Sequence, residues 1–453
     1  MIGKLASSPD KNKRIFSRRG ADGYIPLPKK LQLAHTGALI WLLLSIYLSL
    51  NWVKELSLIV TLPVALFIIG GIAYIPGYIN AFNVISLLLD RQPKFKVSNP
   101  IVPVTILIAC YNEEKNIRTT LQYLHKQYYL GEIKIIVIDN NSTDRTADCA
   151  RQFAKKFNMD IRVIHESKKG KHHALNSALK LVDTPYTIIL DADTILMPGS
   201  LRYIVSRQLT APEEVVATAG AILVRNGRKS FWTKLQEWEY FLGIASIKRM
   251  QGMYQGTLVA QGAFSIFKTK NLVDLGGFPD VIGEDIVVTW LLLGKGYKVY
   301  FEPLAVAFTD APETFQHFQR QRSRWARGMI EALKQIKPWQ QPNSFPRYAT
   351  FLNLLMPYID IVYSLAWIPG LLLAFFGITW IAGPMTLLVL PLALLQSFIL
   401  YNYQKNVFKH LNLRIRKNKM GFILYVLLYQ FMLSPISLYG YIEEVFKLKR
   451  VWK

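Results

Sequence analysis

Long apolar segments lie near both ends of the chain, and residues 100–347 between them are more polar. The segments near the N-terminus are 33–52 and 56–79, around the short polar link Asn51–Glu55. A membrane-spanning helix needs about 20 mostly apolar residues, so both segments are long enough. The alternative is a buried hairpin of a soluble core, but few soluble helices are apolar on every side. We therefore expect two spanning helices within 35–80.

The apolar residues near the C-terminus predict about three more spanning helices over 348–453. A basic loop, 403–420, interrupts them, and the last segment contains Pro435. That segment either crosses once, which gives five spans, or forms a re-entrant pair bent at the proline. The apolar segments are 350–376, 378–402 and 421–440.

Positive residues mark the cytoplasmic side of spanning segments. The N-terminal stretch 1–34 and the loop 403–420 are both basic, so we expect both in the cytosol. Two spans after the N-terminal stretch then place 80–347 in the cytosol as well. The sequence predicts a multi-pass protein of the plasma (inner) membrane with a cytosolic domain inserted between its spanning helices.

Apolar, β-rich runs alternate with helical stretches through the middle of the chain. This alternation is typical of βαβ units and predicts an α/β domain with a mostly parallel sheet over 100–310. The expected strands are 102–110, 133–138, 161–165 and 187–190, and the expected helices include 115–127, 168–179 and 286–293.

Acidic residues follow three of the expected strands. Ligands of open α/β sheets bind at the carboxyl ends of the strands, so these side chains would meet at one edge. Their charges would repel one another unless a cation, or a cationic or hydrogen-bonding ligand, lay between them. The residues are Glu113, Asp139, Asp191 and Asp193.

Asp191 and Asp193 form an Asp-x-Asp pair directly after a short β-rich strand. A hard divalent cation takes carboxylate oxygens and usually substrate phosphates as well. A solvated turn is the common explanation of such a tripeptide on its own. At a strand end, beside the other motifs, the pair favours a metal site.

The basic segment 168–176 reads Lys-Lys-Gly-Lys-His-His-Ala-Leu-Asn and opens a helix. Glycine permits close approach of a ligand, and a helix N-terminus favours anions. The segment therefore predicts a diphosphate contact, with a solvated run of charge as the alternative.

Gly283-Glu284-Asp285 lies just before another expected helix. Acidic residues are favoured at helix N-termini, so a capping role is the simpler interpretation. A general base at Asp285 is compatible with that role.

Residues 311–347 are expected to form amphipathic helices at the membrane interface. On a helix, Gln321, Arg324 and Trp325 share one face. An indole is a good platform for a sugar ring, and arginine can hold a pyrophosphate with two hydrogen bonds. The alternative is a basic helix on anionic lipid. The arginines available to lipid would be Arg320, Arg322 and Arg327.

The composition narrows the choice of partners and compartment. Lysine and arginine number 54 against 30 acidic residues, a net charge of +24. This charge lies mainly beside the apolar segments, and the sequence shows no nucleic-acid recognition module, so we expect no nucleic-acid partner. The two cysteines, Cys110 and Cys149, cannot build a disulfide framework, which favours a reducing compartment.

Taken in order along the chain, these motifs resemble the membrane-integral, processive family-two glycosyltransferases, which include the cellulose, chitin, hyaluronan and poly-N-acetylglucosamine synthases. The layout is most similar to the poly-β-1,6-N-acetylglucosamine synthase branch. The resemblance covers nearly the whole chain. Its motifs are Tyr-Asn-Glu at 111–113, Asp139, Lys-Gly-Lys and Ala-Leu-Asn within 169–176, Asp-Ala-Asp at 191–193, Gly-Glu-Asp at 283–285, Gln-Arg-Ser-Arg-Trp at 321–325, and the runs 259–264 and 275–278.

The resemblance implies a GT-A fold, an inverting transfer from a UDP-sugar, Mg²⁺ or Mn²⁺ as cofactor, and Asp285 as the catalytic base. The metal ligands would be Asp191 and Asp193. By motif match, the nucleotide sugar would contact Tyr111, Glu113, Asp139, Lys171 and Asp191. The diphosphate and the acceptor would contact Glu284, Gln321, Arg324 and Trp325.

Two positions depart from the family pattern. Gly283 stands where many members have threonine, and Gln261 stands before Gly262 where many have serine or cysteine. The second change lies near the expected acceptor pocket, so it bears on the acceptor sugar more than on the reaction type.

We expect elongation of a polysaccharide from UDP-N-acetylglucosamine, coupled to export, in contact with the lipid bilayer and with a small membrane subunit as a candidate partner. Transfer of a single sugar to a lipid acceptor is the alternative. A transporter would place ionisable residues inside its spans, and only Asp360 stands out there. A transporter would also leave the middle domain unexplained.

Overall fold

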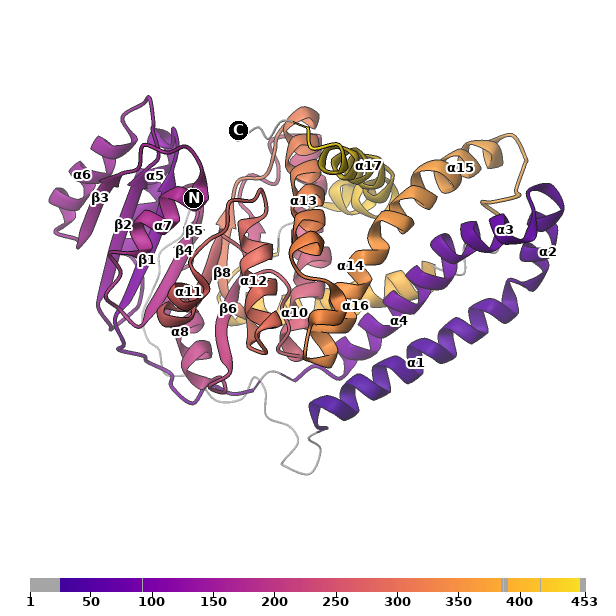
Figure 1. The fold of residues 1–453 in the computed structure, drawn as a ribbon, viewed down its shortest axis with the longest axis horizontal. Helices are drawn as coiled ribbons and strands as arrows, with labels where there is room; N and C mark the ends of the chain where they lie inside the picture. The colour runs from indigo at the N-terminus through magenta and orange to yellow at the C-terminus, as the bar shows by residue number, and fades with distance from the viewer. Residues whose placement is uncertain (1–24, 92, 384–385, 387–389, 416, 449–453) are drawn as a thin grey trace.

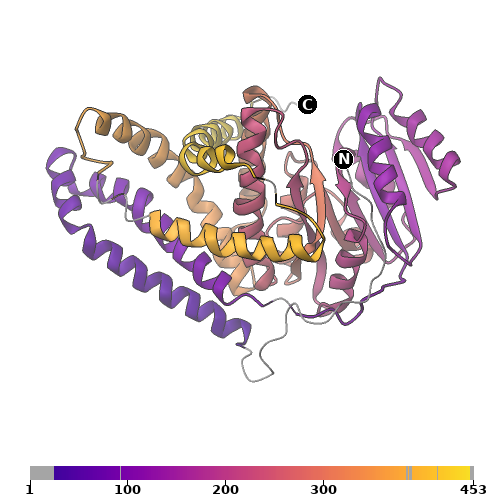
Figure 2. The same cartoon turned by 180° about the vertical axis from the view of Figure 1, so that it is seen from behind.

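The computed structural model describes residues 25–91, 93–383, 386, 390–415 and 417–448. An α/β domain forms one side of the molecule, and long helices from both ends of the chain extend together from its other side (Figures 1 and 2). Residues 1–24 and 449–453 lie outside the described part. The expectations for the N-terminal stretch and the end of the basic tail therefore remain predictions.

The domain is built on one eight-stranded sheet with the order β3-β2-β1-β4-β7-β6-β8-β5. Strands β3, β2, β1 and β4 are parallel, as are β6 and β8, whereas β7 and β5 run antiparallel to their neighbours. The expected mostly parallel sheet is confirmed. The strands are β1 (Val104–Cys110), β2 (Ile133–Asp139), β3 (Ile161–His165), β4 (Tyr186–Leu190), β5 (Ile195–Leu196), β6 (Val215–Val224), β7 (Phe264–Lys268) and β8 (Lys298–Thr309).

Helices cover both faces of the sheet. Successive strand residues point to opposite faces, and apolar side chains on both faces are buried against helices. In β1, Ile106 and Ile108 belong to one buried cluster and Leu107 to another. The helices of the domain are α5 (Glu114–His125), α6 (Thr146–Phe157), α7 (Lys171–Leu179), α8 (Ser200–Thr210), α9 (Phe231–Trp238), η3 (Glu239–Ile244), α10 (Ala245–Met253), α11 (Thr269–Leu275), α12 (Glu284–Gly294), α13 (Phe315–Gln335) and η4 (Pro338–Gln340).

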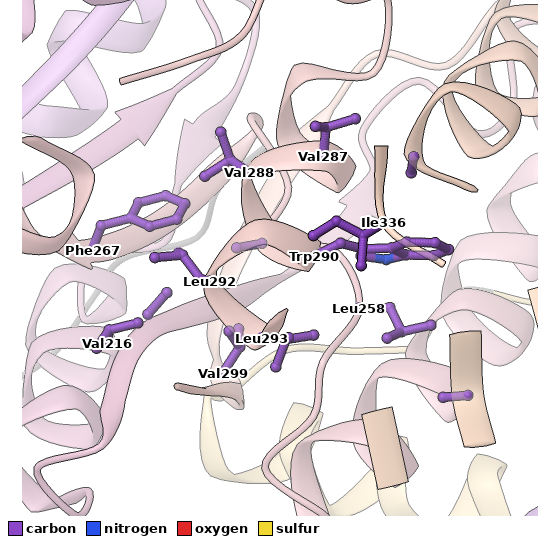
Figure 3. Close-up of a cluster of buried hydrophobic side chains, with 14 of the residues drawn as sticks. Val216, Leu258, Phe267, Val287, Val288, Trp290, Leu292, Leu293, Val299 and Ile336 are labelled. Carbon is purple, nitrogen blue, oxygen red and sulfur yellow. The ribbon is translucent and has the colours of Figure 1, made fainter. Parts of the chain in front are cut away.

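Apolar side chains of helix α12 lie in a buried cluster with residues from other elements (Figure 3). Val288 and Trp290 are fully buried, and the cluster around them includes Phe267 of β7. Burial of each large apolar side chain contributes roughly 1.5–3 kcal/mol relative to exposure. The N-terminus of α12, where Glu284 and Asp285 lie, is therefore firmly placed.

Four helices in the described part are long and apolar enough to cross a membrane. Two precede the domain and two follow it, whereas the sequence predicts two before and about three after (Figure 1). They are α1 (Leu27–Leu48), the continuous helix of α3 (Leu62–Ile69), η2 (Gly70–Tyr74) and α4 (Ile75–Leu88), the helix of α14 (Ser344–Val362), η5 (Tyr363–Trp367) and α15 (Ile368–Phe375), and α17 (Lys419–Val445).

Two apolar segments differ from their expected form. The link Asn51–Glu55 lies within helix α2 (Leu50–Ile59), and the next long helix begins only at Leu62, where Pro63 occupies its first turn. Residues 378–402 correspond in part to α16 (Leu390–His410), which is not among the four long apolar helices. Gln404 near its end donates to the Phe241 carbonyl of the domain, 2.9 Å away.

Helix α17 is continuous through Pro435, so the described residues form one helix and not a bent pair. The C-terminal end of this helix packs along α13, the helix that carries the Gln-x-x-Arg-Trp motif. This contact places a candidate spanning helix against the helix that carries Gln321, Arg324 and Trp325.

Candidate active site

The carboxyl ends of β1, β2 and β4 meet at one edge of the sheet. In the β1–β2 register Cys110 pairs with Asp139, so Glu113 and Asp139 follow neighbouring strands. Asp191 follows β4, the strand on the other side of β1. The structure therefore brings together the acidic residues that the sequence placed at this edge.

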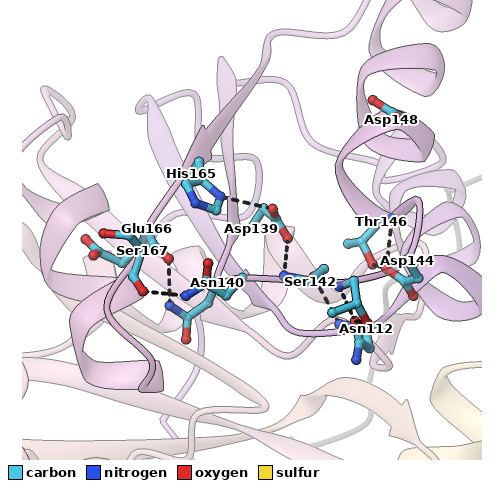
Figure 4. Close-up of polar contacts among 12 residues, drawn as sticks. Asn112, Asp139, Asn140, Ser142, Asp144, Thr146, Asp148, His165, Glu166 and Ser167 are labelled. Carbon is cyan, nitrogen blue, oxygen red and sulfur yellow. Dashed lines mark hydrogen bonds and ion pairs between the residues drawn. The ribbon is translucent and has the colours of Figure 1, made fainter.

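Asp139 is fixed by two contacts (Figure 4). One carboxylate oxygen lies 3.2 Å from Nδ1 of His165, and the other accepts from the Ser142 backbone N–H at 3.2 Å. The next residue, Asn140, accepts from the Gly170 N–H at 2.9 Å and donates to the Lys168 carbonyl. The loop after β2 thus positions the start of α7.

The loop after β1 is joined to the same region. Asn112 has a left-handed backbone, with φ of 56°, and its side-chain oxygen accepts from the Thr143 N–H at 2.7 Å. The Glu113 N–H donates to the Thr146 hydroxyl at 2.8 Å. Tyr111, between β1 and this loop, is half-buried. These contacts form a rim of polar groups beside Asp139.

Lys171 is the centre of a charged cluster at the start of α7. Its ammonium donates to Asp191 at 2.8 Å and lies 3.2 Å from Glu284. Burial alone would lower the pKa of Lys171, but Asp191 and then Glu284 outweigh it and raise the pKa. Lys171 therefore links the residues after β4 to the N-terminus of α12.

Gly262 approaches this cluster closely. A Cβ at this position would lie 2.5 Å from the Lys171 Nζ, far inside normal contact. The absence of a side chain at 262 thus permits Lys171 to reach both carboxylates.

Asp193 lies beside this cluster and is largely desolvated. Its carboxylate accepts from the hydroxyls of Thr194 and Thr309, both at 3.2 Å. Burial, followed by the charges of Asp191 and Glu113, raises the pKa of Asp193 to about 6. An added cation would relieve this concentration of negative charge.

The structure offers only part of a metal coordination shell. Among the described residues there is no group of three or more His, Cys, Asp or Glu side chains placed to hold a metal ion. Asp191 and Asp193 supply two hard oxygen donors, which suit Mg²⁺ when substrate phosphates and water complete the shell. The donor set therefore fits a metal that arrives with a phosphorylated substrate.

Asp285 lies in the first turn of α12 with a half-buried side chain. One oxygen accepts from the Ile286 N–H at 2.8 Å, and the other accepts from the Gly262 N–H at 3.3 Å. The adjacent Glu284 is buried, and burial raises its pKa even though Lys171 opposes the effect. Asp285 is thus one residue from the Lys171 cluster and has contact with the Gly262 loop.

Helix α13 supports the loop before Asp285. The Glu331 carboxylate accepts from the backbone N–H groups of Ile282, at 2.7 Å, and Gly283, at 3.3 Å. A Cβ on Gly283 would lie 2.8 Å from the Gly328 backbone, so the two segments are in direct contact. No local sequence pattern marks Glu331, because its partners lie 48 and 49 residues away.

The motif residues of α13 differ in exposure. Gln321 is half-buried, Arg324 is exposed and Trp325 is 42% exposed. The alternative of a lipid-facing arginine surface is wrong for Arg322 and Arg327, which are both buried. Their charges are met by carboxylates inside the protein, namely Glu239, Glu443 and Glu444.

Gln261, which departs from the family pattern near the expected acceptor pocket, makes a hydrogen bond that supports its own loop. Its side-chain amide donates to the Gly220 carbonyl of β6 at 2.6 Å. On the other side of this loop, the buried Lys248 donates to the Val259 carbonyl. Lys248 is a site neighbour that sequence reasoning missed, since a lone lysine on a helix carries no visible signal.

Known proteins are similar to this domain in sequence and in fold. Residues 100–328 match the family model described as "Glycosyltransferase like family 2". The poly-beta-1,6-N-acetyl-D-glucosamine synthase of Staphylococcus aureus is 33% identical over 281 residues, which cover 61% of this chain and 67% of that protein. Its counterpart from Staphylococcus epidermidis is 34% identical over 268 residues, covering 59% and 62%.

A mannosyltransferase from Pyrobaculum calidifontis, solved in complex with GDP-Man and Mn²⁺, superposes with a TM-score of 0.57. The superposition covers 84% of this chain and 98% of that one, at 19% identity, and supports the expected GT-A fold. The matched family model spans half of the chain and contains the whole cluster around Lys171 and Asp285. The protein is a glycosyltransferase and belongs to glycosyltransferase family 2.

Proposed function

We propose that the protein elongates a polysaccharide of N-acetylglucosamine at the membrane, using UDP-N-acetylglucosamine as donor. The observation that carries the proposal is the continuous path from Asp191 through Lys171 and Glu284 to Asp285. Along this path the Lys171 ammonium, which could bind a diphosphate, lies near a half-buried carboxylate that could act as a base. The names of the staphylococcal relatives support the choice of sugar.

The nucleoside of the donor would lie along the rim made by Tyr111, Glu113 and Asp139. Carboxylates that accept hydrogen bonds from a base or ribose suit such a rim, and Asp139 is already held by His165 and the Ser142 N–H. The diphosphate would then extend toward Lys171. Lys171 would exchange part of its contact with Asp191 for the phosphate oxygens.

Asp191 and Asp193 would hold the divalent cation together with the diphosphate. Bound there, Mg²⁺ or Mn²⁺ would neutralise charge on the departing nucleoside diphosphate. Lys171 and the exposed Arg324 would add hydrogen bonds to the same phosphate oxygens.

Asp285 would take the proton from the acceptor hydroxyl. That oxygen attacks the anomeric carbon as the bond to the diphosphate breaks, and the pair of electrons leaves with UDP. A single displacement inverts the anomeric centre, so an α-linked donor gives a β-glycosidic bond. Glu284 would keep Lys171 in place, and Gln321 and Trp325 would hold the terminal sugar of the acceptor.

The four long apolar helices support a membrane location and an acceptor that leaves through the bilayer. Under this proposal the catalytic domain faces the cytosol, where UDP-sugars are made. Export through the helices and contact with a small membrane subunit remain predictions.

Donor use by the full-length protein in isolated membranes tests the proposal. UDP-N-acetylglucosamine, UDP-glucose and UDP-glucuronate are offered separately and together, with Mg²⁺ or Mn²⁺. We expect turnover of UDP-N-acetylglucosamine alone, and its loss on chelation of the metal. Turnover of a different donor would overturn the sugar assignment, and a short, organic-extractable product would indicate a lipid acceptor.

A further inference from the structure

Arg322 lies inside the Gln-x-x-Arg-Trp motif but faces the protein interior. Its side chain is only 1% exposed, and its guanidinium donates to one oxygen of Glu239 at 2.5 Å. A weaker contact joins it to the Gln236 side-chain oxygen at 3.4 Å. The ion pair is therefore formed inside the domain, and the same guanidinium also donates to the Gln321 side-chain oxygen at 2.5 Å.

The same guanidinium lies against the Trp325 ring. The central carbon of Arg322 is 4.0 Å from the Trp325 ring centroid, and the Phe318 ring lies on another side at 4.8 Å. A cation over an indole is attracted by the ring electrons, and the attraction grows when water is excluded. Trp325 thus has one side held by Arg322, while the residue as a whole is 42% exposed.

The partner of Arg322 also contacts a candidate spanning helix. The second oxygen of Glu239 accepts a hydrogen bond from the Tyr429 hydroxyl of α17. Glu239 begins η3, a short π-helical turn, and is itself buried. A continuous chain of contacts therefore runs from α17 through Glu239 and Arg322 to Trp325.

Packing of α13 on α17 has other supports. Arg327 of α13 lies 3.5 Å from Glu444 of α17, and Lys334 donates to the same carboxylate at 2.7 Å. Gly440 of α17 also lies against the backbone of Ser323. These contacts join the two helices without the Arg322–Glu239 pair. A buried ion pair is often no more stabilising than apolar side chains in its place, so stability alone does not explain why this pair is present.

We infer that Arg322 is a positioning residue for Trp325, and that Tyr429, through Glu239, ties the orientation of this acceptor platform to spanning helix α17. The inference rests on the proposed role of Trp325 in holding the acceptor sugar. Movement of α17 would then change how well the growing end is retained. Retention of that end determines the length of the product.

The test uses the full-length protein in lipid nanodiscs, with UDP-N-acetylglucosamine and a short β-linked N-acetylglucosamine oligosaccharide as acceptor. The variants are Tyr429→Phe and Arg322→Lys, with Trp325→Ala as reference. Arg327→Gln is the matched control, because it removes a buried arginine of α13 that pairs with α17 but does not contact Trp325. Acceptor KM, donor KM and product length are measured for each.

We expect Tyr429→Phe and Arg322→Lys to raise the acceptor KM about fivefold and to shorten the product, with the donor KM unchanged. Arg327→Gln should leave the acceptor KM and product length near wild type. Equal changes in donor and acceptor KM, or the same shortening in Arg327→Gln, would overturn the inference in favour of general packing. If Trp325→Ala leaves the acceptor KM unchanged, the proposed role of Trp325 itself is wrong.

Discussion

Replacing Gly262 with alanine tests the geometry of the charged cluster most sharply. The new Cβ would lie 2.5 Å from the Lys171 Nζ, so the ammonium must move by about 1 Å to restore a normal contact. If the ammonium moves directly away from Asp191, their 2.8 Å contact lengthens to about 3.7 Å, which sets the upper limit of the effect. The substitution leaves every charge of the site in place and changes only the position of one of them.

The size of the effect follows from Coulomb's law. At an effective dielectric constant of about 20, the attraction falls from about 6 to about 4.5 kcal/mol over this change in distance. Asp191 is partly exposed, so solvent screening reduces the difference. A misplaced Lys171 should weaken its contact with the diphosphate by a similar amount. Since about 1.4 kcal/mol corresponds to a factor of ten, we expect kcat/KM for the donor to fall threefold to tenfold.

A double-mutant cycle with Lys171→Met identifies the cause. If Gly262→Ala acts by displacing Lys171, adding it to Lys171→Met should cost almost nothing further. Gly294→Ala, at the far end of α12, serves as a control glycine because the nearest atom to its Cβ is the flexible end of Ile336. Additive losses in the double mutant would refute the reasoning and show that residue 262 acts independently of Lys171.

Three further predictions concern single side chains. Asp285→Asn should lower turnover by roughly a hundredfold or more while UDP binding, measured by calorimetry, stays near wild type; near-normal turnover would remove Asp285 as the base. Arg207→Met should destabilise the domain by about 3–5 kcal/mol, because Glu302 is then left buried without its 2.6 Å partner; thermal unfolding in detergent measures this, and an unchanged melting temperature would contradict it. Burial lowers the pKa of Lys248 to about 8, although Asp285 opposes this, so folding favours the neutral amine. The free energy of unfolding should therefore fall by up to about 3 kcal/mol as the pH is lowered from above about 10.5 to below 8. Lys248→Met should therefore raise the melting temperature at pH 6 more than at pH 10, and an equal change at both would refute the assignment.

Much of the first half of the sheet follows from local sequence. The strand 161–165 has the predicted bounds, and the first, second and fourth strands differ from prediction by one or two residues, because short apolar β-rich runs end at clear polar turns. Strands β6 and β8 gave no such signal. Strand β6 is buried along its whole length and rich in small residues, and a continuous apolar run does not distinguish a strand from a buried helix.

The candidate site could be predicted only where its residues come directly after strands or lie at the start of helices. Glu113, Asp139 and Asp191 meet because parallel strands end at the same edge. The supports of the site come from distant segments: Glu239 lies 83 residues from Arg322 and 190 from Tyr429. The alternative of lipid-facing arginines was wrong for Arg322 and Arg327 for the same reason, since a helix face shows its charges but not the carboxylates that the fold brings to them.

The most direct test of the central claim is the size of the product made by the purified full-length protein. The protein is placed in nanodiscs with labelled UDP-N-acetylglucosamine and Mn²⁺, and the product is sized by gel filtration beside an Asp285→Asn control. The account predicts a high-molecular-weight, metal-dependent polymer of β-linked N-acetylglucosamine that the variant does not make. A product of one added sugar on an extractable lipid, or an equal yield from Asp285→Asn, would contradict it.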